Sequence, residues 1–110
     1  METFVMLTRV PTESLHQPRS YQTLERHFME QVRKDCPGVK WIADYAVAGP
    51  FDYLDVFTAP DVRTAMRVSM LVRLYGRSHS EIWPAVAWAD FKKMAGELPD
   101  KGGLELPEAA

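Results

Sequence analysis

The sequence predicts an α+β fold, the ferredoxin-like β-α-β-β-α-β plait, in which a four-stranded antiparallel sheet carries two helices on one face. Three observations predict it: the order of apolar periodicities, two amphipathic helical segments between strands, and one tight hairpin in the middle of the chain. A chain of 110 residues is long enough for a single core. We expect one domain over residues 1–96 and a disordered tail, rich in Pro, Gly and charge, over 97–110.

The first half of the chain reads as strand, helix, strand. Phe4–Thr8 is a short apolar run with β-branched members, which is typical of a strand. Ser20 is expected to cap a helix whose apolar positions recur every three or four residues as far as Cys36, where a Pro-Gly pair stops it. The apolar and aromatic run Val39–Val47 predicts the second strand.

The second half repeats the order strand, helix, strand and adds a short helix. Tyr53–Thr58 is rich in β-branched and aromatic residues and predicts the third strand. Asp61–Tyr75 is predicted to be a helix that its first residue caps and that Gly76 follows. Ser78–Val86 predicts the fourth strand, and Ala89–Gly96 a short last helix.

A turn at Gly49–Asp52 joins the second and third strands. Gly49 and Pro50 interrupt the apolar pattern. We expect Gly49 to take a backbone conformation that a side chain would strain, and Asp52 to accept a hydrogen bond from a backbone N–H of the turn.

The length of this turn decides which residues of the two strands face each other. A four-residue loop pairs Val47 with Asp52 and sets Asp44 opposite Asp55. A loop one residue longer pairs Tyr45 with Asp55 instead. We favour the longer loop, because like charges directly opposite one another destabilise a sheet.

Both faces of the predicted sheet are apolar. Val5 and Leu7 lie on one side of the first strand, and Phe4 and Met6 on the other. Two helices cover only one face, so we expect a homodimer that buries the open face of the sheet.

Composition excludes several classes of protein. The net charge is −2 and no basic block is present, which argues against a nucleic-acid partner. The longest apolar runs fall far short of about 20 residues, so no membrane span is expected. The single cysteine, Cys36, predicts a buried structural thiol in a cytoplasmic protein.

Four segments carry a likeness to a known family: Phe4–Thr8, Gly49–Tyr53, Ala59–Asp61 and Glu81–Ala85. Together they resemble the GYD-domain proteins over roughly residues 3–95, with Phe51 standing where tyrosine is usual. The resemblance implies a small dimeric α+β barrel and supplies no catalytic residues. The wider group of such barrels includes cofactor-free monooxygenases, isomerases, decarboxylases and haem enzymes, which is an analogy of fold alone.

Acid–base chemistry is the first reaction type that the residues suggest. His79, Glu81 and Trp83 fall on one face of the fourth strand. Histidine titrates near neutrality, and a carboxylate beside it tunes its basicity, so His79 and Glu81 are candidate catalytic residues. The alternative is a strand end that carries solvated polar side chains.

Asp55 is a polar residue inside an apolar strand and is a third candidate catalytic residue. We expect it to share one cavity with His79, two strands and roughly 10 Å away, and to orient a ligand hydroxyl. The alternative is a structural hydrogen bond or a salt bridge between subunits. The candidate ligand-binding residues are Arg9, Tyr45, Tyr53 and Trp83.

Three functions compete. The aromatic-rich sheet favours a module that binds a small apolar or aromatic molecule. The second is a cofactor-independent enzyme of isomerase, monooxygenase or decarboxylase type with His79 as acid or base. The third is a structural dimer without a ligand. His79 and Glu81 with Asp55 would give three metal ligands, but His16 and His27 lie in other contexts, so no metal site is predicted and no cofactor is expected.

Overall fold

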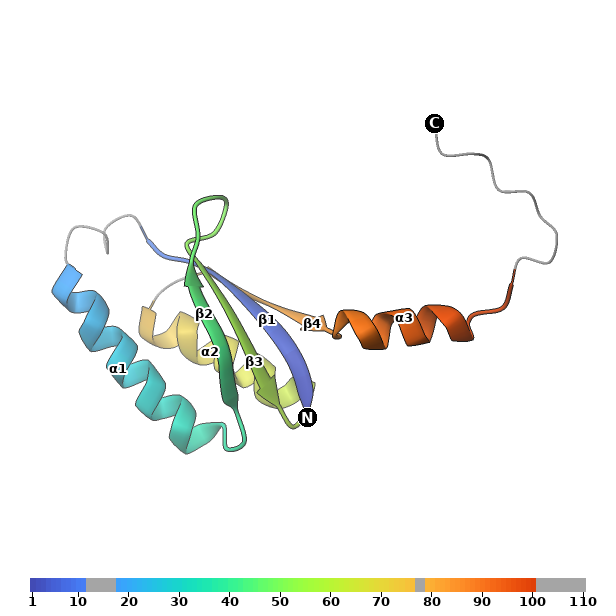
Figure 1. Cartoon of the computed structure of the whole chain (residues 1–110). Coiled ribbons are helices and arrows are strands. Elements are labelled where there is room, and N and C mark those ends of the chain that lie inside the picture. Colours follow the sequence, from blue (N-terminus) through green and yellow to red (C-terminus); the bar gives the residue numbers. More distant parts are fainter. Residues whose placement is uncertain (12–17, 77–78, 101–110) are drawn as a thin grey trace.

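The computed structural model describes residues 1–11, 18–76 and 79–100, and every structural statement below concerns these residues. The sheet has the order β2-β3-β1-β4 with antiparallel neighbours throughout, and α1 and α2 cover one of its faces, whereas α3 extends away from the body (Figure 1). This architecture confirms the predicted plait. The elements are β1 (Glu2–Arg9), α1 (Pro18–Asp35), β2 (Lys40–Ala46), β3 (Tyr53–Ala59), α2 (Val62–Gly76), β4 (His79–Ala85) and α3 (Trp88–Glu97).

Most predicted boundaries are right within two residues, and the helix ends show why some are not. α1 begins at Pro18, so the predicted cap at Ser20 is wrong; proline suits the first turn of a helix because its missing N–H has no partner there anyway. Asp61 caps α2 as predicted, since its Oδ1 accepts a hydrogen bond of 2.8 Å from the Thr64 N–H. Gly76 is the last residue of α2 rather than the one after it. Most of the predicted disordered tail, residues 101–110, lies outside the described residues.

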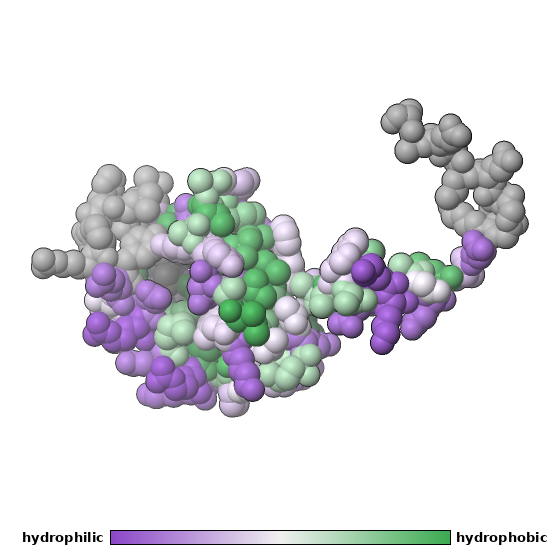
Figure 2. All heavy atoms as spheres, viewed as in Figure 1, coloured by the Kyte–Doolittle hydropathy of each residue, from purple (hydrophilic) through white to green (hydrophobic). Residues whose placement is uncertain are grey.

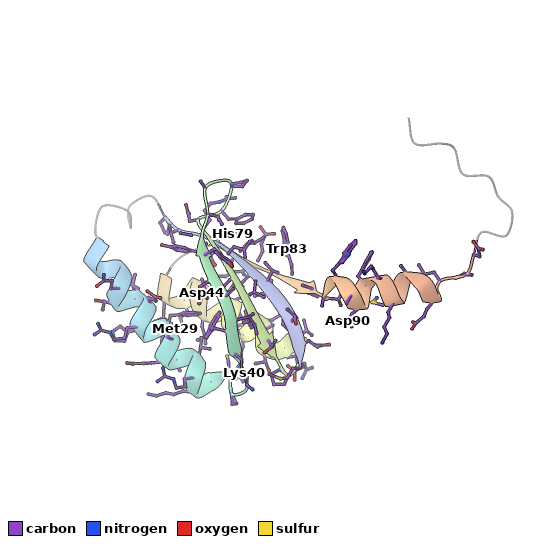
Figure 3. The ribbon with its side chains drawn as sticks, in the orientation of Figure 1. Met29, Lys40, Asp44, His79, Trp83 and Asp90 are labelled. Atoms are coloured by element: carbon purple, nitrogen blue, oxygen red, sulfur yellow. The ribbon has the colours of Figure 1, made fainter. Side chains whose placement is uncertain are left out.

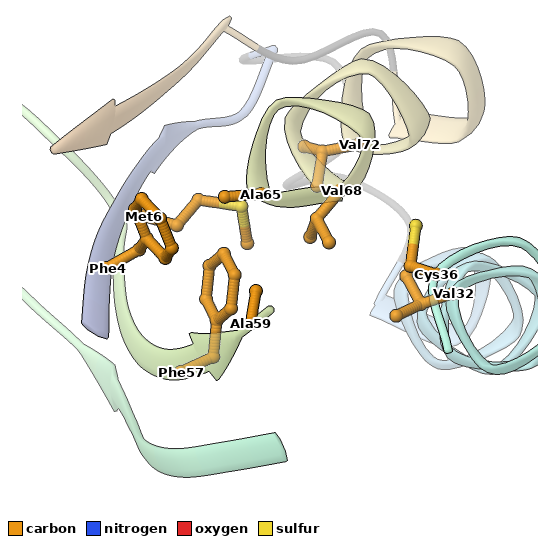
Figure 4. Close-up of a cluster of buried hydrophobic side chains, with 9 residues drawn as sticks. All are labelled: Phe4, Met6, Val32, Cys36, Phe57, Ala59, Ala65, Val68 and Val72. Carbon is orange, nitrogen blue, oxygen red and sulfur yellow. The ribbon is translucent and has the colours of Figure 1, made fainter. Parts of the chain in front are cut away.

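The core lies between the helices and one face of the sheet (Figure 4). The rings of Phe4 on β1 and Phe57 on β3 stack with centroids 5.8 Å apart. We call the face that carries them the helix face. Alternate residues such as Val5 and Val56 point the other way, to the open face. The buried cluster comprises Phe4, Met6, Val32, Cys36, Phe57, Ala59, Ala65, Val68 and Val72.

The pairing of β2 with β3 is the one that the sequence analysis disfavoured. Asp44 lies opposite Asp55, and Tyr45 opposite Leu54. The Val47 N–H donates a 2.9 Å hydrogen bond to the carbonyl of Asp52, which closes a four-residue loop. The prediction of the longer loop is therefore wrong. It assumed that Asp44 and Asp55 would both be charged, and the electrostatics of the pair, described below, show a smaller cost for placing them opposite each other.

The conformationally demanding glycine is not the predicted one. A Cβ on Gly49 would have no other atom within 4 Å, and Gly49 is not among the glycines with positive φ. Gly38, which follows α1, has φ of 91°, and a Cβ there would meet Cγ of Pro60 at 2.9 Å. The prediction for Gly49 is wrong, and Gly38 is the position that requires glycine.

The Gly49–Asp52 turn fastens onto the end of β1. The Asp52 N–H donates to the carbonyl of Thr8, and the Val10 N–H donates to Asp52 Oδ2, both at 2.9 Å. Arg9 Nε donates to the carbonyl of Pro50 at 2.8 Å. The Asp52 side chain thus accepts a hydrogen bond from a distant strand end and not, as predicted, from the turn itself. We call this set of contacts the clasp.

α1 is held mainly by α2. The Tyr75 hydroxyl of α2 donates to Gln31 Oε1 of α1 at 3.2 Å, and Val32 near the end of α1 and Cys36 just after it lie in the core. The described backbone of α1 does not approach any strand closely, and its Phe28 ring meets the Trp41 ring of β2 at a centroid distance of 6.2 Å. The middle of α1, around Phe28 and Met29, borders the pocket described below.

Candidate functional site

A pocket of about 350 Å³ lies between α1 and the helix face, near the ends of β1 and β2. Met29 on α1 and Asp44 on β2 belong to opposite walls (Figure 3). Most of the lining is aromatic or aliphatic, with three carboxyl groups and one hydroxyl from threonine added. The lining residues are Met6, Thr8, Val10, Leu24, Glu25, Phe28, Met29, Trp41, Asp44, Tyr45, Ala46, Tyr53, Asp55, Val72 and Tyr75.

Asp44 and Asp55 form a carboxyl pair in the pocket wall. Burial raises the pKa of Asp55, and a hydrogen bond with the Asp44 side chain and the negative charges of Asp44 and Glu25 raise it further, to about 8. Asp55 therefore keeps its proton at neutral pH and shares it with Asp44. This shared proton explains why a pairing that sets two carboxyl groups opposite each other persists in the sheet.

Thr8 adds a polar group without a partner. It is only 5 % exposed, lies on the helix face beside Tyr53, and lines the pocket. Among the described residues, its Oγ1 has no hydrogen-bond partner. Buried hydroxyls are almost always satisfied, so Thr8 is an exception among the residues that line the pocket.

His79, Glu81 and Trp83 share one face of β4, as predicted, and the register places them on the open face, where Figure 3 shows His79 and Trp83. His79 Nε2 lies 3.0 Å from Glu81 Oε2, and Trp83 Nε1 donates to Glu81 Oε1 at 3.3 Å. The hydrogen bond with His79 lowers the pKa of Glu81 most, and the hydrogen bond with Trp83 lowers it further. The His79 and Glu81 side chains are 53 % and 39 % exposed, so this group lies on the surface.

The clasp places Phe51 against the same group. The Phe51 ring stacks on the His79 ring with centroids 6.4 Å apart, and the Arg9 guanidinium carbon lies 5.3 Å from the Phe51 centroid. Phe51 thus packs between a cation and an imidazole, a role that needs a ring but no hydroxyl group.

The prediction that His79 and Asp55 share one cavity is wrong. Asp55 pairs with Met6 on the helix face, whereas His79 pairs with Arg9, whose side chain belongs to the open face. The sheet itself separates them.

The predicted site residues therefore fall into two sets. Asp55 and Tyr53 line the pocket, and Arg9, His79, Glu81 and Trp83 lie on the open face. Tyr45 has the register of the open face but, on an edge strand, also borders the pocket.

Several pocket residues were missed as candidates: Thr8, Glu25, Phe28, Asp44 and Tyr75. Strand alternation is the sequence signal that separates the two faces of the sheet.

On β4, Ile82 packs against the core. His79, Glu81 and Trp83 stand at odd spacings from Ile82 and therefore belong to the other face of the sheet. Within the described part of the chain, no three His, Cys, Asp or Glu side chains lie in an arrangement that could hold a metal ion.

The match to a sequence model of a known family covers most of the chain. No helix in the described ranges has both the length and the apolar character needed to cross a bilayer. Neither the comparison with curated proteins nor that with solved structures gives a match. The sequence model of the GYD domain matches residues 4–95, which span β1 to α3 and include the clasp. The chain therefore belongs to the GYD-domain family.

Proposed function

We propose that the protein binds a small molecule with an aromatic or apolar body in the pocket between α1 and the sheet. One observation carries the proposal: a pocket of about 350 Å³ whose walls are mostly aromatic and aliphatic, with a few polar groups converging in it. Ligand sites in proteins have this composition, and the volume, near the lower end of their usual range, suits one or two rings with a short substituent.

A fragment screen with a filled-pocket variant tests this. Small aromatic fragments are screened by ligand-observed NMR against the wild type, against Ala46→Trp, which fills the pocket, and against Ala89→Trp on exposed α3. Fragments that bind the wild type and Ala89→Trp but not Ala46→Trp support the proposal. Fragments that bind all three proteins equally, or no binding at all, would contradict it and favour a structural dimer without a ligand.

The carboxyl pair favours a second candidate, a cofactor-independent enzyme. A carboxyl group whose pKa is about 8 is poised to exchange a proton near neutral pH, and it lies in the pocket. The acid or base is then Asp55, because His79 is on the other side of the sheet. Deuterium incorporation from D₂O at carbons next to a carbonyl in bound fragments, lost in Asp55→Asn, would support this activity, and unchanged incorporation in the variant would exclude Asp55 as its base.

The open face is proposed to bury itself against a second copy of the chain. Hydrophobic residues gather over the strands (Figure 2), and Trp83 and Tyr45, with the register of the open face, are 50 % and 60 % exposed. A self-complementary apolar face suits a two-fold dimer. The free, buried Cys36 supports a reducing compartment, and we place the protein in the cytoplasm.

Light scattering tests the dimer. Val56→Lys puts a charge on the open face, and Met70→Lys puts the same charge on the exposed outer side of α2. We expect a dimer mass at micromolar concentration for the wild type and Met70→Lys, and a monomer mass for Val56→Lys. A monomeric wild type, or a Val56→Lys protein that stays dimeric, contradicts this interface.

A further inference from the structure

We propose that the pocket takes an organic cation, a protonated amine attached to an aromatic or aliphatic group, in preference to a neutral or anionic molecule of the same size. This inference rests on the proposed function and adds the chemical class of the ligand. Two features of the lining carry it, the sign of its charges and the aromatic rings on several of its walls, and one unpartnered hydroxyl group nearby adds to them.

The described lining carries acidic groups and no basic ones, and with Asp55 protonated its negative charge comes from Glu25 and from the Asp44–Asp55 pair as a whole. Glu25, Asp44 and Asp55 come from three different elements, α1, β2 and β3, and no Lys, Arg or His is among the described residues that line the pocket. An anionic ligand would be repelled here, while a cation would be attracted by the field of the carboxylates in a partly desolvated space.

The apolar walls suit a cation as well as a hydrocarbon. Phe28, Trp41, Tyr53 and Tyr75 supply rings from α1, β2, β3 and α2, so aromatic groups surround the space on several sides. The negative faces of such rings attract ammonium groups, and this attraction strengthens when water is excluded.

The unpartnered Thr8 hydroxyl is independent of both features. Thr8 is 95 % buried, lines the pocket, and is two residues along β1 from Met6, which pairs with Asp55. A threonine oxygen has lone pairs that accept a hydrogen bond from an ammonium N–H. Thr8 Oγ1 itself has almost no solvent-accessible surface, so an amine at the carboxyl pair satisfies it only after the neighbouring side chains move, whereas a hydrocarbon cannot satisfy it in any position.

The test compares three probes of nearly equal shape: phenethylamine, which is charged at pH 7, neutral propylbenzene, and the 3-phenylpropanoate anion. Binding to the full chain is measured by NMR titration at pH 7. We expect phenethylamine to bind at least about tenfold more tightly than either of the others.

Two double variants identify the source of this preference. Asp44→Asn/Asp55→Asn removes the pair as a whole, because either single change leaves one carboxyl free to ionise. Asp90→Asn/Asp100→Asn changes the formal net charge by the same amount on the exposed C-terminal part of the chain. The preference for phenethylamine should disappear in the first variant and persist in the second.

The outcomes separate this inference from the proposed function. Propylbenzene or the anion binding as tightly as the amine, or a preference that survives in Asp44→Asn/Asp55→Asn, overturns the cation while leaving the pocket as a binding site. Failure of all three probes also overturns it, and the fragment screen then decides the pocket separately. The wild-type comparison alone decides the matter if the double variant does not fold.

Discussion

Replacing Asp55 with asparagine should make the protein more stable at alkaline pH. A carboxyl group titrates at about pH 3.9 in an unfolded chain, whereas in the folded protein burial and the neighbouring Asp44 raise the pKa of Asp55 to about 8. Between these two values the folded state binds more protons than the unfolded state. The free energy of unfolding therefore falls as pH rises from about 4 to 8, and stays reduced above that.

The size of the effect follows from the same values. Each pH unit between them costs about 1.4 kcal/mol of stability, so four units would cost about 5 kcal/mol if the group were fully desolvated. Asp55 is only partly buried, and solvent screening reduces the expected loss to roughly 2–3 kcal/mol. Asparagine keeps the shape and can donate to Asp44, but it carries no titrating proton.

Urea unfolding at pH 5, 7 and 9 measures this. The difference in unfolding free energy between Asp55→Asn and the wild type should be small at pH 5 and grow to roughly 2–3 kcal/mol in favour of the variant by pH 9. Asp90→Asn, on exposed α3, is the control and should show no such trend. If the Asp55→Asn curve runs parallel to that of the wild type at all three pH values, the carboxyl pair does not share a proton as described.

Three further predictions concern stability. Gly38→Ala should lower the free energy of unfolding by more than about 1 kcal/mol, because Gly38 has a positive φ and lies against the ring of Pro60. In the same urea titration Gly49→Ala should be close to neutral. Equal costs for the two variants would refute the assignment of Gly38 as the position that requires glycine. Asp52→Ala should cost about 1–2 kcal/mol because the N–H at the end of β1 loses its acceptor, and Asp52→Asn, which keeps an acceptor, should cost less. The buried Ser69 hydroxyl donates a 2.8 Å hydrogen bond to the Ser80 hydroxyl. Ser69→Ala should therefore lower the free energy of unfolding by about 1–3 kcal/mol, and the double alanine variant by little more. Additive losses in a double-mutant cycle would contradict this hydrogen bond.

The core could be predicted because alternate residues of a strand lie on the same face of the sheet, so the apolar pattern within one strand indicates which side chains are buried together. Phe4, Met6 and Phe57 fall on the helix face as their spacing requires. The relative phase of different strands leaves a weaker record when both faces are apolar, which is why His79 and Asp55 were expected on the same side.

Two other errors have electrostatic and conformational causes. The pairing of Asp44 with Asp55 was disfavoured as a repulsion between two charges, but a pair that shares a proton carries one charge fewer. Gly49 was chosen for its place in a turn, although the strained backbone is at Gly38, where the end of α1 passes close to Pro60. The local sequence does not predict which glycine has a positive φ, nor that Gly38 lies close to Pro60 in the fold.

The clasp bears on what a shared motif says about related chains. The Gly49–Asp52 turn holds the hairpin to the end of β1 through Asp52, and the Phe51 ring packs on Arg9 and His79, outside the pocket. In this chain these residues therefore serve the closure of the sheet. In this chain the segment that closes the sheet and the residues that line the pocket, such as Thr8, Asp44 and Asp55, are different sets. Functional subgroups within the family should therefore be drawn by comparing the residues that line the space beneath α1, and the motif should be used only to recognise the fold.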